Sequence, residues 1–448
     1  MKWGVRSVGA SAEDASTPAP AAAGPVWVGV LDLDEEGPVT GINGSLGPEY
    51  QQARILVRLH RAPLGFVWVP AMPEESLTAR SRAIAEATLV DALRGHAELD
   101  DEGVKQGVAS RWEAQMACPR HFPDQRGEGI SVIVCTRNRP ALLPDSLGSL
   151  MRSTYDPLEI LVVDNAPSDS ATRDIVTALA ADDPRVRYTC EPRPGKSLAL
   201  NHGLAQAKFE IAAVTDDDAL ADPGWLSAVA AAFEADPGTV CVTGMVASSA
   251  LSTGSERYFD ARYSWGEGFQ PRRFDLGKHR HDSPFYPFSA GIFGTGANCA
   301  FRRRAVEDIG GFDPLLGAGG PQRGGADLDI FLRLILAGGR ITYLPSALIW
   351  HRHRANPRAL AEQMYTYGHG LGAYLGKHLS NRELRGALLR HGLSHAGRAL
   401  GRQRSAARSG QLGIEGKRLA VYEAFGIVPG AVRYWLAARR ASEPPVGE

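Results

Sequence analysis

Residues 211–220, Ile-Ala-Ala-Val-Thr-Asp-Asp-Asp-Ala-Leu, place Asp216, Asp217 and Asp218 directly after an apolar run that is typical of a buried strand. Carboxylates this close repel one another and raise each other's pKa, and a bound cation relieves that repulsion. A hard divalent cation such as Mg2+ or Mn2+ takes one or two carboxylates together with phosphate oxygens of a substrate. The alternative is a solvated turn that caps the next helix, but Asp222 with the proline after it already supplies a cap. The stretch therefore predicts a metal-bridged diphosphate at Asp216 and Asp218.

Around this stretch, apolar strand-like runs alternate with helical patterns. The strand-like runs cover 130–135, 158–165, 186–190 and 211–215, and the helical patterns cover 141–151, 171–179 and 197–207. Continuous apolar strands separated by helices predict an α/β fold with a mostly parallel sheet flanked by helices. Ligands of such sheets bind beyond the carboxyl ends of the strands. Arg137, Asp164 and the three aspartates all fall at these ends, which favours a binding site there.

Two common nucleotide-binding motifs are excluded. Gly195-Lys196-Ser197 resembles the end of a phosphate-binding loop, but Cys190 stands where that loop requires its first glycine. No Gly-x-Gly-x-x-Gly follows the first strand of the 130–215 region, which disfavours a dinucleotide fold.

The charge of the chain is balanced overall but unevenly distributed. The 448 residues hold 49 Lys and Arg against 50 Asp and Glu, which excludes a general nucleic-acid-binding surface. The segment 377–448, however, holds 13 Lys and Arg against 5 Asp and Glu. A basic tail of this kind faces an acidic surface, which is a membrane, a partner or the body of the protein itself.

The five cysteines are scattered and form no Cys-x-x-Cys pair, so the sequence predicts neither a disulfide framework nor a zinc knuckle. No apolar segment follows the basic residues near the N-terminus, and no apolar run reaches the ~18 residues of a membrane span. These features predict a cytoplasmic protein, with peripheral contact at the inner face of a membrane left open.

Composition and pattern divide the chain into four parts. The sequence predicts a disordered segment at 1–24, a small N-terminal accessory α/β domain at 25–118, the main α/β domain at 126–355 and a basic helical region at 356–448. The accessory domain contains no group of residues that indicates chemistry.

Eight short motifs of the main domain carry a resemblance to a known family. They are SVIVCTRNR at 131–139, VVDN at 162–165, GKSLALN at 195–201, TDDD at 215–218, GANCAFR at 296–302, GGFD at 310–313, ADLD at 326–329 and HRHR at 351–354. Their order and spacing resemble those of family 2 glycosyltransferases over residues 130–354, roughly half of the chain. The resemblance implies the GT-A fold of nucleotide-diphospho-sugar transferases and an inverting, metal-dependent reaction.

The resemblance also implies roles for the strand-end residues. Thr136, Arg137 and Asp164 are expected to hold the base of the nucleotide, and Lys196 is expected beside it, with a solvated lysine as the alternative. Asp216 is expected toward the ribose and the metal, and Asp218 on a metal that bridges both phosphates. Asp217 is the variable middle position of this nucleotide-sugar motif, with simple solvation as its alternative.

The general base is expected at Asp327, because the family places it second in a Glu-Asp pair that opens a helix. A carboxylate within reach of the acceptor hydroxyl suits that task. Here the pair reads Ala326-Asp327, so the glutamate is absent and acceptor handling is in doubt. The alternative is that Asp327 only stabilises a helix N-terminus, and Asp329 is interpreted as structural. His351 is expected as a metal ligand, beside His353 on the same face by period two.

The sequence thus predicts a metal-dependent inverting glycosyltransferase, with Mn2+ or Mg2+ as cofactor and a nucleoside-diphosphate sugar as donor. The acceptor is a hydroxyl of a glycan, a lipid-linked sugar or a small molecule. One alternative is a non-catalytic or partner-dependent nucleotide-sugar-binding protein. The other, a sugar-phosphate nucleotidyltransferase, is disfavoured because a Gly-rich loop with Arg or Lys after the first strand is absent. Residues 431–440 fit either a membrane-surface helix or a helix packed on the catalytic domain.

Overall fold

The computed structural model describes residues 24–97, 126–262, 268–283, 285–289, 291–381, 384–386 and 414–442. These residues form two compact units, of which the first contains 24–97 with short segments at 249–253 and 268–270. The second contains the remaining described residues. Residues 1–23 of the predicted disordered segment lie outside the described residues. Residues 98–118 of the predicted accessory domain also lie outside them.

The first unit is a four-stranded sheet with two helices. The sheet has the order β2-β1-β3-β4, formed by β1 (Val26–Asp32), β2 (Thr40–Gly41), β3 (Gln52–Leu59) and β4 (Ala62–Pro70). β1 and β3 are parallel, and the other pairs are antiparallel. The helical part of this unit consists of α1 (Glu74–Thr88) and α2 (Val90–Ala97). The break at Leu89 leaves both Leu89 and Leu93 buried in the core of this unit.

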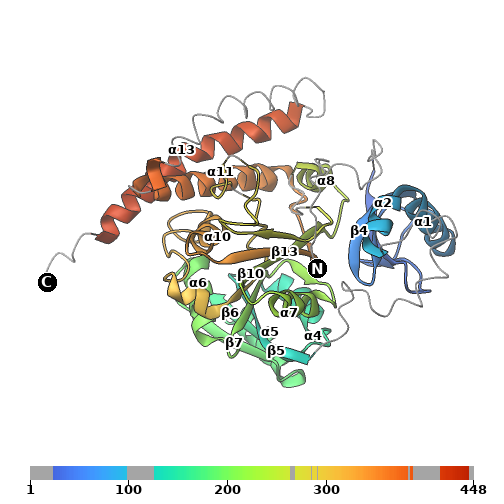
Figure 1. Cartoon of the computed structure of the whole chain (residues 1–448), viewed down its shortest axis with the longest axis horizontal. Coiled ribbons are helices and arrows are strands. Elements are labelled where there is room, and N and C mark those ends of the chain that lie inside the picture. The colour runs from blue at the N-terminus through green and yellow to red at the C-terminus, as the bar shows by residue number, and fades with distance from the viewer. Residues whose placement is uncertain are drawn as a thin grey trace. The chain divides into compact units, whose positions relative to one another are not determined.

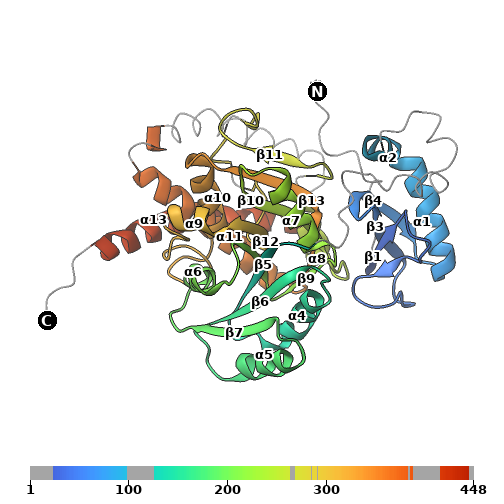
Figure 2. The same ribbon diagram turned by 60° about the horizontal axis from the view of Figure 1, so that its bottom comes forward.

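The second unit is built on a larger sheet, with the order β11-β13-β10-β12-β8-β5-β6-β7 and β9 paired with β13 (Figure 1). Its strands are β5 (Arg126–Thr136), β6 (Asp156–Asn165), β7 (Val186–Glu191), β8 (Ile211–Asp216), β9 (Ala219–Ala221), β10 (Thr239–Ser248), β11 (Arg272–Phe274), β12 (Asn298–Arg302) and β13 (Arg340–His351). Helices lie on both faces of this sheet (Figure 2). They are α4 (Leu143–Met151), α5 (Ala171–Asp182), α6 (Lys196–Gln206), α7 (Trp225–Ala235), α8 (Gly254–Arg262), α9 (Arg303–Asp308) and α10 (Ala326–Leu336), with the short 3-10 helix η2 (Pro140–Leu142).

The direction of the strands brings the predicted site residues to one edge of the sheet. β5 is parallel to both β6 and β8, with Thr136 opposite Asp164 and Cys135 opposite Asp216. The carboxyl ends of these strands therefore meet. β12 runs antiparallel between β8 and β10, with Asn298 opposite Thr215, so the chain also enters β12 at this edge.

The first residue of α7 differs from the expectation. The Asp-Pro pair predicted a helix that begins at Pro223, but α7 begins at Trp225 with Gly224 as its N-cap. The reason is a local turn, in which an Asp222 carboxylate oxygen accepts a hydrogen bond from the Gly224 backbone N–H at 3.0 Å. Asp222 therefore orders the entry to the helix.

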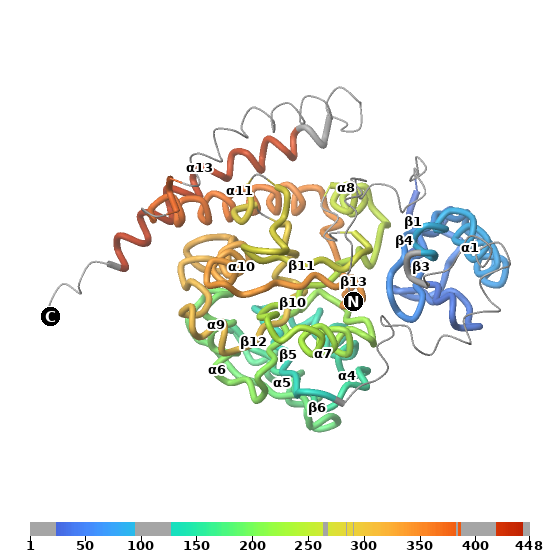
Figure 3. The backbone as a smooth tube through the Cα atoms, viewed as in Figure 1, coloured from blue at the N-terminus to red at the C-terminus, as the bar shows by residue number. Residues whose placement is uncertain are grey.

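Two long helices, α11 (Pro357–Ser380) and α13 (Ile414–Ser442), pack against each other in the C-terminal part of the second unit (Figure 3). Glycines line their contact. A Cβ on Gly372 of α11 would lie 1.9 Å from the Ile427 carbonyl oxygen, and one on Gly430 of α13 would lie 2.0 Å from the His369 carbonyl oxygen. Only glycine permits backbones to approach this closely. Within the described residues, no helix combines the length and apolarity needed to cross a membrane.

Candidate active site

The three aspartates lie at the end of β8 and in the turn to β9, where side chains from the loop after β5 hold them. The Thr136 hydroxyl donates to one Asp217 carboxylate oxygen at 2.7 Å, and Arg139 Nη1 donates to the other at 2.5 Å. Arg139 Nη2 donates to Asp218 at 2.7 Å, so one guanidinium joins two consecutive carboxylates. Asp217 is buried, and the alternative that it is simply solvated is wrong.

The surroundings shift the pKa values of these carboxyl groups in opposite directions. Burial raises the pKa of Asp217 to about 6, and the neighbouring Asp218 adds to the rise, although Arg139 opposes it. Burial would also raise the pKa of Asp218, but the His351 imidazole and Arg139 hold it well below its usual range. Asp218 is therefore a carboxylate anion at neutral pH.

Asp216, Asp218 and His351 form the group that is able to hold a metal ion. One ligand atom of each lies within 4.8 Å of the others. His351 Nε2 lies 3.1 Å from Asp218 Oδ1 and 4.0 Å from Asp216 Oδ2. The pairing of β13 with β9, with His351 opposite Ala219, brings the imidazole to the aspartates. Carboxylate oxygens with one imidazole nitrogen suit Mn2+ and related divalent cations, so the donor set fits the predicted cofactor.

The His353 ring packs against the ring of His351. The two rings are stacked with centroids 5.2 Å apart, and the Phe259 ring lies 4.2 Å from His353 on its other side. Burial and the neighbouring His351 lower the pKa of His353 to about 3, so this ring is neutral at physiological pH. Burial would also lower the pKa of His351, but Asp218 raises it above its ordinary value.

Lys196 opens α6 and forms an ion pair with Asp216 through its Nζ. The alternative of a solvated lysine is therefore wrong. Burial would lower the pKa of Lys196, but Asp216 and, more weakly, Asp327 raise it, so the ammonium is within electrostatic reach of both carboxylates. The Lys196 backbone N–H donates to the Ala318 carbonyl at 2.8 Å, which ties the glycine-rich 312–325 segment to the same residue.

Asp164 ends β6 and is completely buried. The Tyr188 hydroxyl donates to its Oδ2 at 3.1 Å, and Oδ1 is buried with no hydrogen-bond partner among the described residues. Burial raises the pKa of this carboxyl group. A buried acceptor without a donor is costly, so the geometry suits a ligand that brings an N–H group. Arg137, in contrast, is exposed and donates to the Gly319 carbonyl at 3.1 Å.

Asp327 lies in the first turn of α10, whose N-cap is Gly325 with φ of 84°. Its Oδ2 accepts a hydrogen bond from the Gly296 N–H at 3.2 Å, and its Oδ1 accepts one from the Leu328 N–H at 3.0 Å. Gly296 stands two residues before β12, which pairs with β8 and so connects Asp327 to the edge that carries the aspartates. Asp327 is only half-buried, so its carboxylate is open to an incoming group.

Asp329, two residues further along α10, is completely buried and turned to other partners. It accepts hydrogen bonds from Arg333 Nε at 2.8 Å and His378 Nε2 at 3.0 Å, and Lys377 Nζ lies 2.8 Å away. Burial would raise its pKa, but these three groups lower it to about 2. These contacts agree with the structural interpretation of Asp329.

Three residues of the site received no role from the sequence: Arg139, His353 and Tyr188. Arg139 stands in the same strand-end loop as Arg137 but has different partners, because Arg137 donates to Gly319 and Arg139 to Asp217 and Asp218. The Asn138 backbone between them has φ of 53°, a conformation that asparagine tolerates. Nothing in the sequence joins Tyr188 to Asp164, because their contact depends on strand pairing.

Comparison with known proteins agrees with the resemblance that the sequence carries. Residues 131–310, which are 180 of the 448 residues, match the model of glycosyl transferase family 2. This part of the chain is similar to family 2 glycosyltransferases. The match agrees with the predicted class of enzyme, and the mixed sheet between helices agrees with the predicted GT-A fold class.

The relatives of this chain are distant in sequence. The pre-mycofactocin glycosyltransferase of Mycobacterium tuberculosis is 26% identical over 275 residues, which are 61% of this chain and 53% of that protein. The chain thus spans about half the length of that relative. The glucosyl-dolichyl phosphate glucuronosyltransferase of Haloferax volcanii is 25% identical over 50% of this chain and 69% of that protein. Among solved structures, a mannosyltransferase of Pyrobaculum calidifontis in complex with GDP-Man and Mn2+ is 20% identical with a TM-score of 0.43, over 72% of this chain and 89% of that chain.

Proposed function

We propose that this chain is a family 2 glycosyltransferase that transfers a sugar, with inversion, from a nucleoside-diphosphate sugar to an acceptor hydroxyl, with a divalent cation as cofactor. The observation that carries the proposal is the group formed by Asp216, Asp218 and His351, with the Lys196 ammonium on one side. Two carboxylates and a cationic side chain at the carboxyl ends of parallel strands suit a diphosphate with its metal ion.

The nucleotide base is assigned to the carboxyl end of β6. The partnerless Asp164 Oδ1 is available to accept a hydrogen bond from an N–H of the base. Thr136 acts through Asp217, which it orients, and Arg137 is available at the surface for the nucleotide. Asp217 itself is assigned a supporting role, because it is buried and the side chains of Thr136 and Arg139 hold both of its oxygens.

Departure of the nucleoside diphosphate requires stabilisation of negative charge. A cation held by Asp216, Asp218 and His351 would supply that stabilisation as a Lewis acid. Lys196 contributes a further positive charge beside Asp216, and this charge persists at neutral pH because its pKa is raised. His351 donates no proton in this scheme and serves as a ligand.

Asp327 is assigned as the general base. It takes the proton from the acceptor hydroxyl as that oxygen attacks the anomeric carbon and the bond to the diphosphate breaks. The hydrogen bonds from Gly296 and Leu328 fix the orientation of the carboxylate. Ala326, which stands in place of the expected glutamate, is buried and has no polar group to offer the acceptor. Acceptor recognition is therefore assigned to other residues.

A glycan or a lipid-linked sugar is proposed as acceptor. The support is the name of the Haloferax volcanii relative, which acts on glucosyl-dolichyl phosphate. The predicted cytoplasmic location stays a prediction.

The test is calorimetric binding of UDP, GDP, dTDP and CDP, with and without Mn2+. We expect one nucleotide to bind only with metal, and the variant Asp218→Asn to lose this binding. Asp174→Asn, on the exposed face of α5, is the matched control and should bind as the wild type does. Absence of binding under every condition would contradict the diphosphate site.

The two alternatives are separated by product analysis with the matching donor. Release of the nucleoside diphosphate in the presence of a glycosyl acceptor supports transfer. Binding without turnover supports a non-catalytic binding protein, and release of pyrophosphate from a nucleoside triphosphate with a sugar phosphate supports a nucleotidyltransferase.

A further inference from the structure

The outer face of α13 carries most of the large apolar side chains that the described residues expose. The members of this outer face are Val421, Tyr422, Phe425, Val428, Val432, Trp435 and Leu436, each between 43% and 69% exposed. Elsewhere in the described residues, only Leu276 and Leu336 belong to this class. Side chains at these spacings lie along one side of a helix, so they form one stripe. Exposed apolar surfaces of this kind mark sites that bind a protein or a membrane.

The opposite face of α13 is already committed to α11. Gly426 and Gly430 are buried in the contact, and the Tyr434 hydroxyl donates to Asp313 at 2.9 Å. The close approach at Gly430 allows no rotation of the helix that would bring the outer face inward. A helix that is apolar on both sides is typical of burial or of contact with lipid.

The charges around the outer face are positive. Arg418, Arg433, Arg439 and Arg440 are exposed, and the Arg439 guanidinium lies 3.6 Å from the centroid of the Trp435 ring. Glu423, the one acidic residue among the described side chains of α13, forms an ion pair with Arg262 at 3.6 Å. The preceding segment 387–413 adds five arginines and no acidic residue to the sequence.

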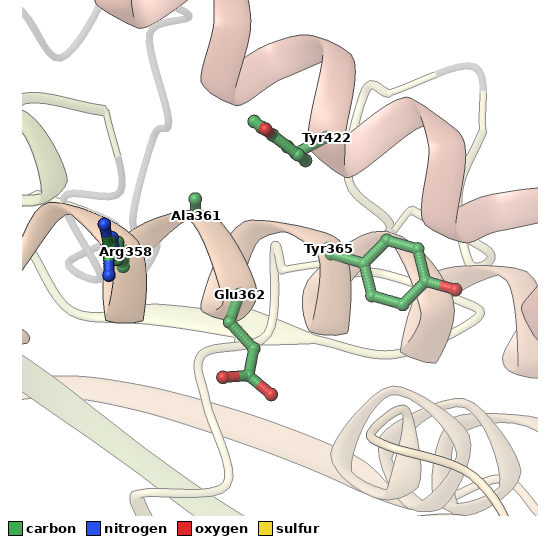
Figure 4. Close-up of a pocket in the computed structure, with 5 residues that line it drawn as sticks. All are labelled: Arg358, Ala361, Glu362, Tyr365 and Tyr422. Carbon is green, nitrogen blue, oxygen red and sulfur yellow. The ribbon is translucent and has the colours of Figure 1, made fainter.

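A pocket of about 390 Å³ adjoins this face between α11 and α13 (Figure 4). It is lined by Arg358, Ala361, Glu362 and Tyr365 of α11 and by Tyr422 of α13. Tyr422 therefore belongs to both the outer face and the pocket, to which Arg358 and Glu362 contribute one charge of each sign.

We propose that the outer face of α13 binds the surface of an anionic phospholipid bilayer. Apolar side chains with arginines at their margin enter the boundary between headgroups and acyl chains, and the arginines attract anionic lipids. Tryptophan and tyrosine suit this boundary because one end of each ring system is apolar and the other polar. A second copy of the chain is disfavoured as occupant, because a symmetric contact would bring the same arginines together. The proposal does not depend on the proposed sugar transfer.

The experiment is sedimentation of the full chain with lipid vesicles, either of phosphatidylcholine alone or of equal parts phosphatidylcholine and phosphatidylglycerol. We expect binding to the anionic vesicles only. The double variants Phe425→Glu with Val428→Glu, and Arg439→Glu with Arg440→Glu, should each weaken it by at least about tenfold. Leu276→Glu is the matched control, since Leu276 is as exposed as Trp435 but lies outside α13, and it should bind as the wild type does.

Circular dichroism and thermal unfolding of each variant show whether it is folded, so that lost binding is attributable to the outer face. Failure of the wild type to bind anionic vesicles would overturn the proposal, as would binding that both double variants retain. Analytical ultracentrifugation tests whether a second copy of the chain binds this face instead. If the wild type is a dimer that does not bind vesicles, and Phe425→Glu is a monomer, the outer face is a dimer interface.

Discussion

Two sites in the second unit contain aspartate side chains with cationic partners. The two sites differ in how far the carboxylates are exposed. At the strand ends, Asp216 pairs with Lys196, but its side chain is 23% exposed and His351 stands beside it. At the junction of α10 and α11, Asp329 is 0% exposed and its partners are Arg333, Lys377 and His378. The first group has room for a further cation, whereas the second is closed by the protein itself.

The difference teaches that proximity of opposite charges does not identify a binding site. Breaking a buried, fully paired group removes stability, because the remaining charges are left without partners. Changing a half-open group removes an interaction with a ligand that the folded chain alone does not make. α10 supplies one aspartate to each environment, so Asp327 and Asp329, two residues apart, allow the comparison within one helix.

The largest effect is expected for Asp327→Asn. Loss of a general base should lower kcat by about 10²–10⁴-fold with the matching donor and acceptor. The melting temperature should equal that of the wild type, because Asp327 makes hydrogen bonds only to two backbone N–H groups. Steady-state kinetics and differential scanning calorimetry check both parts. Unchanged kcat would move the base to another residue.

Asp329→Asn should behave in the opposite way. We expect the free energy of unfolding to fall by about 3–5 kcal/mol, because the variant leaves Lys377, Arg333 and His378 around a neutral amide. Turnover per folded molecule should stay close to that of the wild type. Urea unfolding measures the loss, with Asp327→Asn as the matched control on the same helix. If Asp329→Asn lowered kcat without lowering the free energy of unfolding, Asp329 would not have the structural role that separates it from Asp327.

Arg139→Ala tests whether the aspartates at the strand ends need the arginine that holds them in order to bind metal. The affinity for metal with nucleotide should fall by about 10–100-fold, since Arg139 holds both Asp217 and Asp218. Arg139→Lys should recover part of this loss, because an ammonium retains the charge but not the two-pronged geometry. Calorimetry with Mn2+ measures it, and Arg152→Ala, on an exposed residue after α4, is the control. Equal affinities in all four proteins would show that the aspartates need no such clamp.

The smallest effect is expected for the stability of the fold at acidic pH. The pKa of Asp329 in the folded chain is about 2, below its ordinary value of 3.8, so its ionised form stabilises the fold at neutral pH. That stabilisation is fully present above the ordinary value and is lost as pH falls toward 2, which amounts to about 2 kcal/mol. Urea unfolding between pH 5 and 2, with wild type and Asp329→Asn compared, measures it. Parallel pH profiles of the two proteins would contradict the assignment.

Much of the fold was predictable because apolar runs and strand-end residues are local features. The strands at 130–135, 158–165 and 211–215 lie within β5, β6 and β8, and the parallel order then brings Asp164 near the aspartates. The antiparallel insertion of β12 was not predicted, because an apolar run does not reveal the direction in which a strand joins its neighbours. Asp216, Asp218, His351 and Lys196 lie together, whereas Arg137 is exposed, and the roles of all the predicted site residues stay predictions.

The partners of the aspartates were beyond sequence reasoning for a physical reason. The Arg139 clamp joins positions 78 and 79 residues apart, and the His378 contact of Asp329 spans 49 residues. Hydrogen-bond geometry at such separations is set by packing, which no local pattern encodes.

The glycines between α11 and α13 have a consequence for how chains of this kind are recognised. The family match ends at residue 310, so it carries no information on the C-terminal helices. Gly368, Gly372 and Gly376 recur every four residues, and Gly426 and Gly430 repeat that interval on the partner helix. Because a side chain at Gly372 would collide with a backbone carbonyl, this spacing tolerates no drift. The paired four-residue glycine intervals are thus a steric requirement of this helix pair that can be read directly from the sequence.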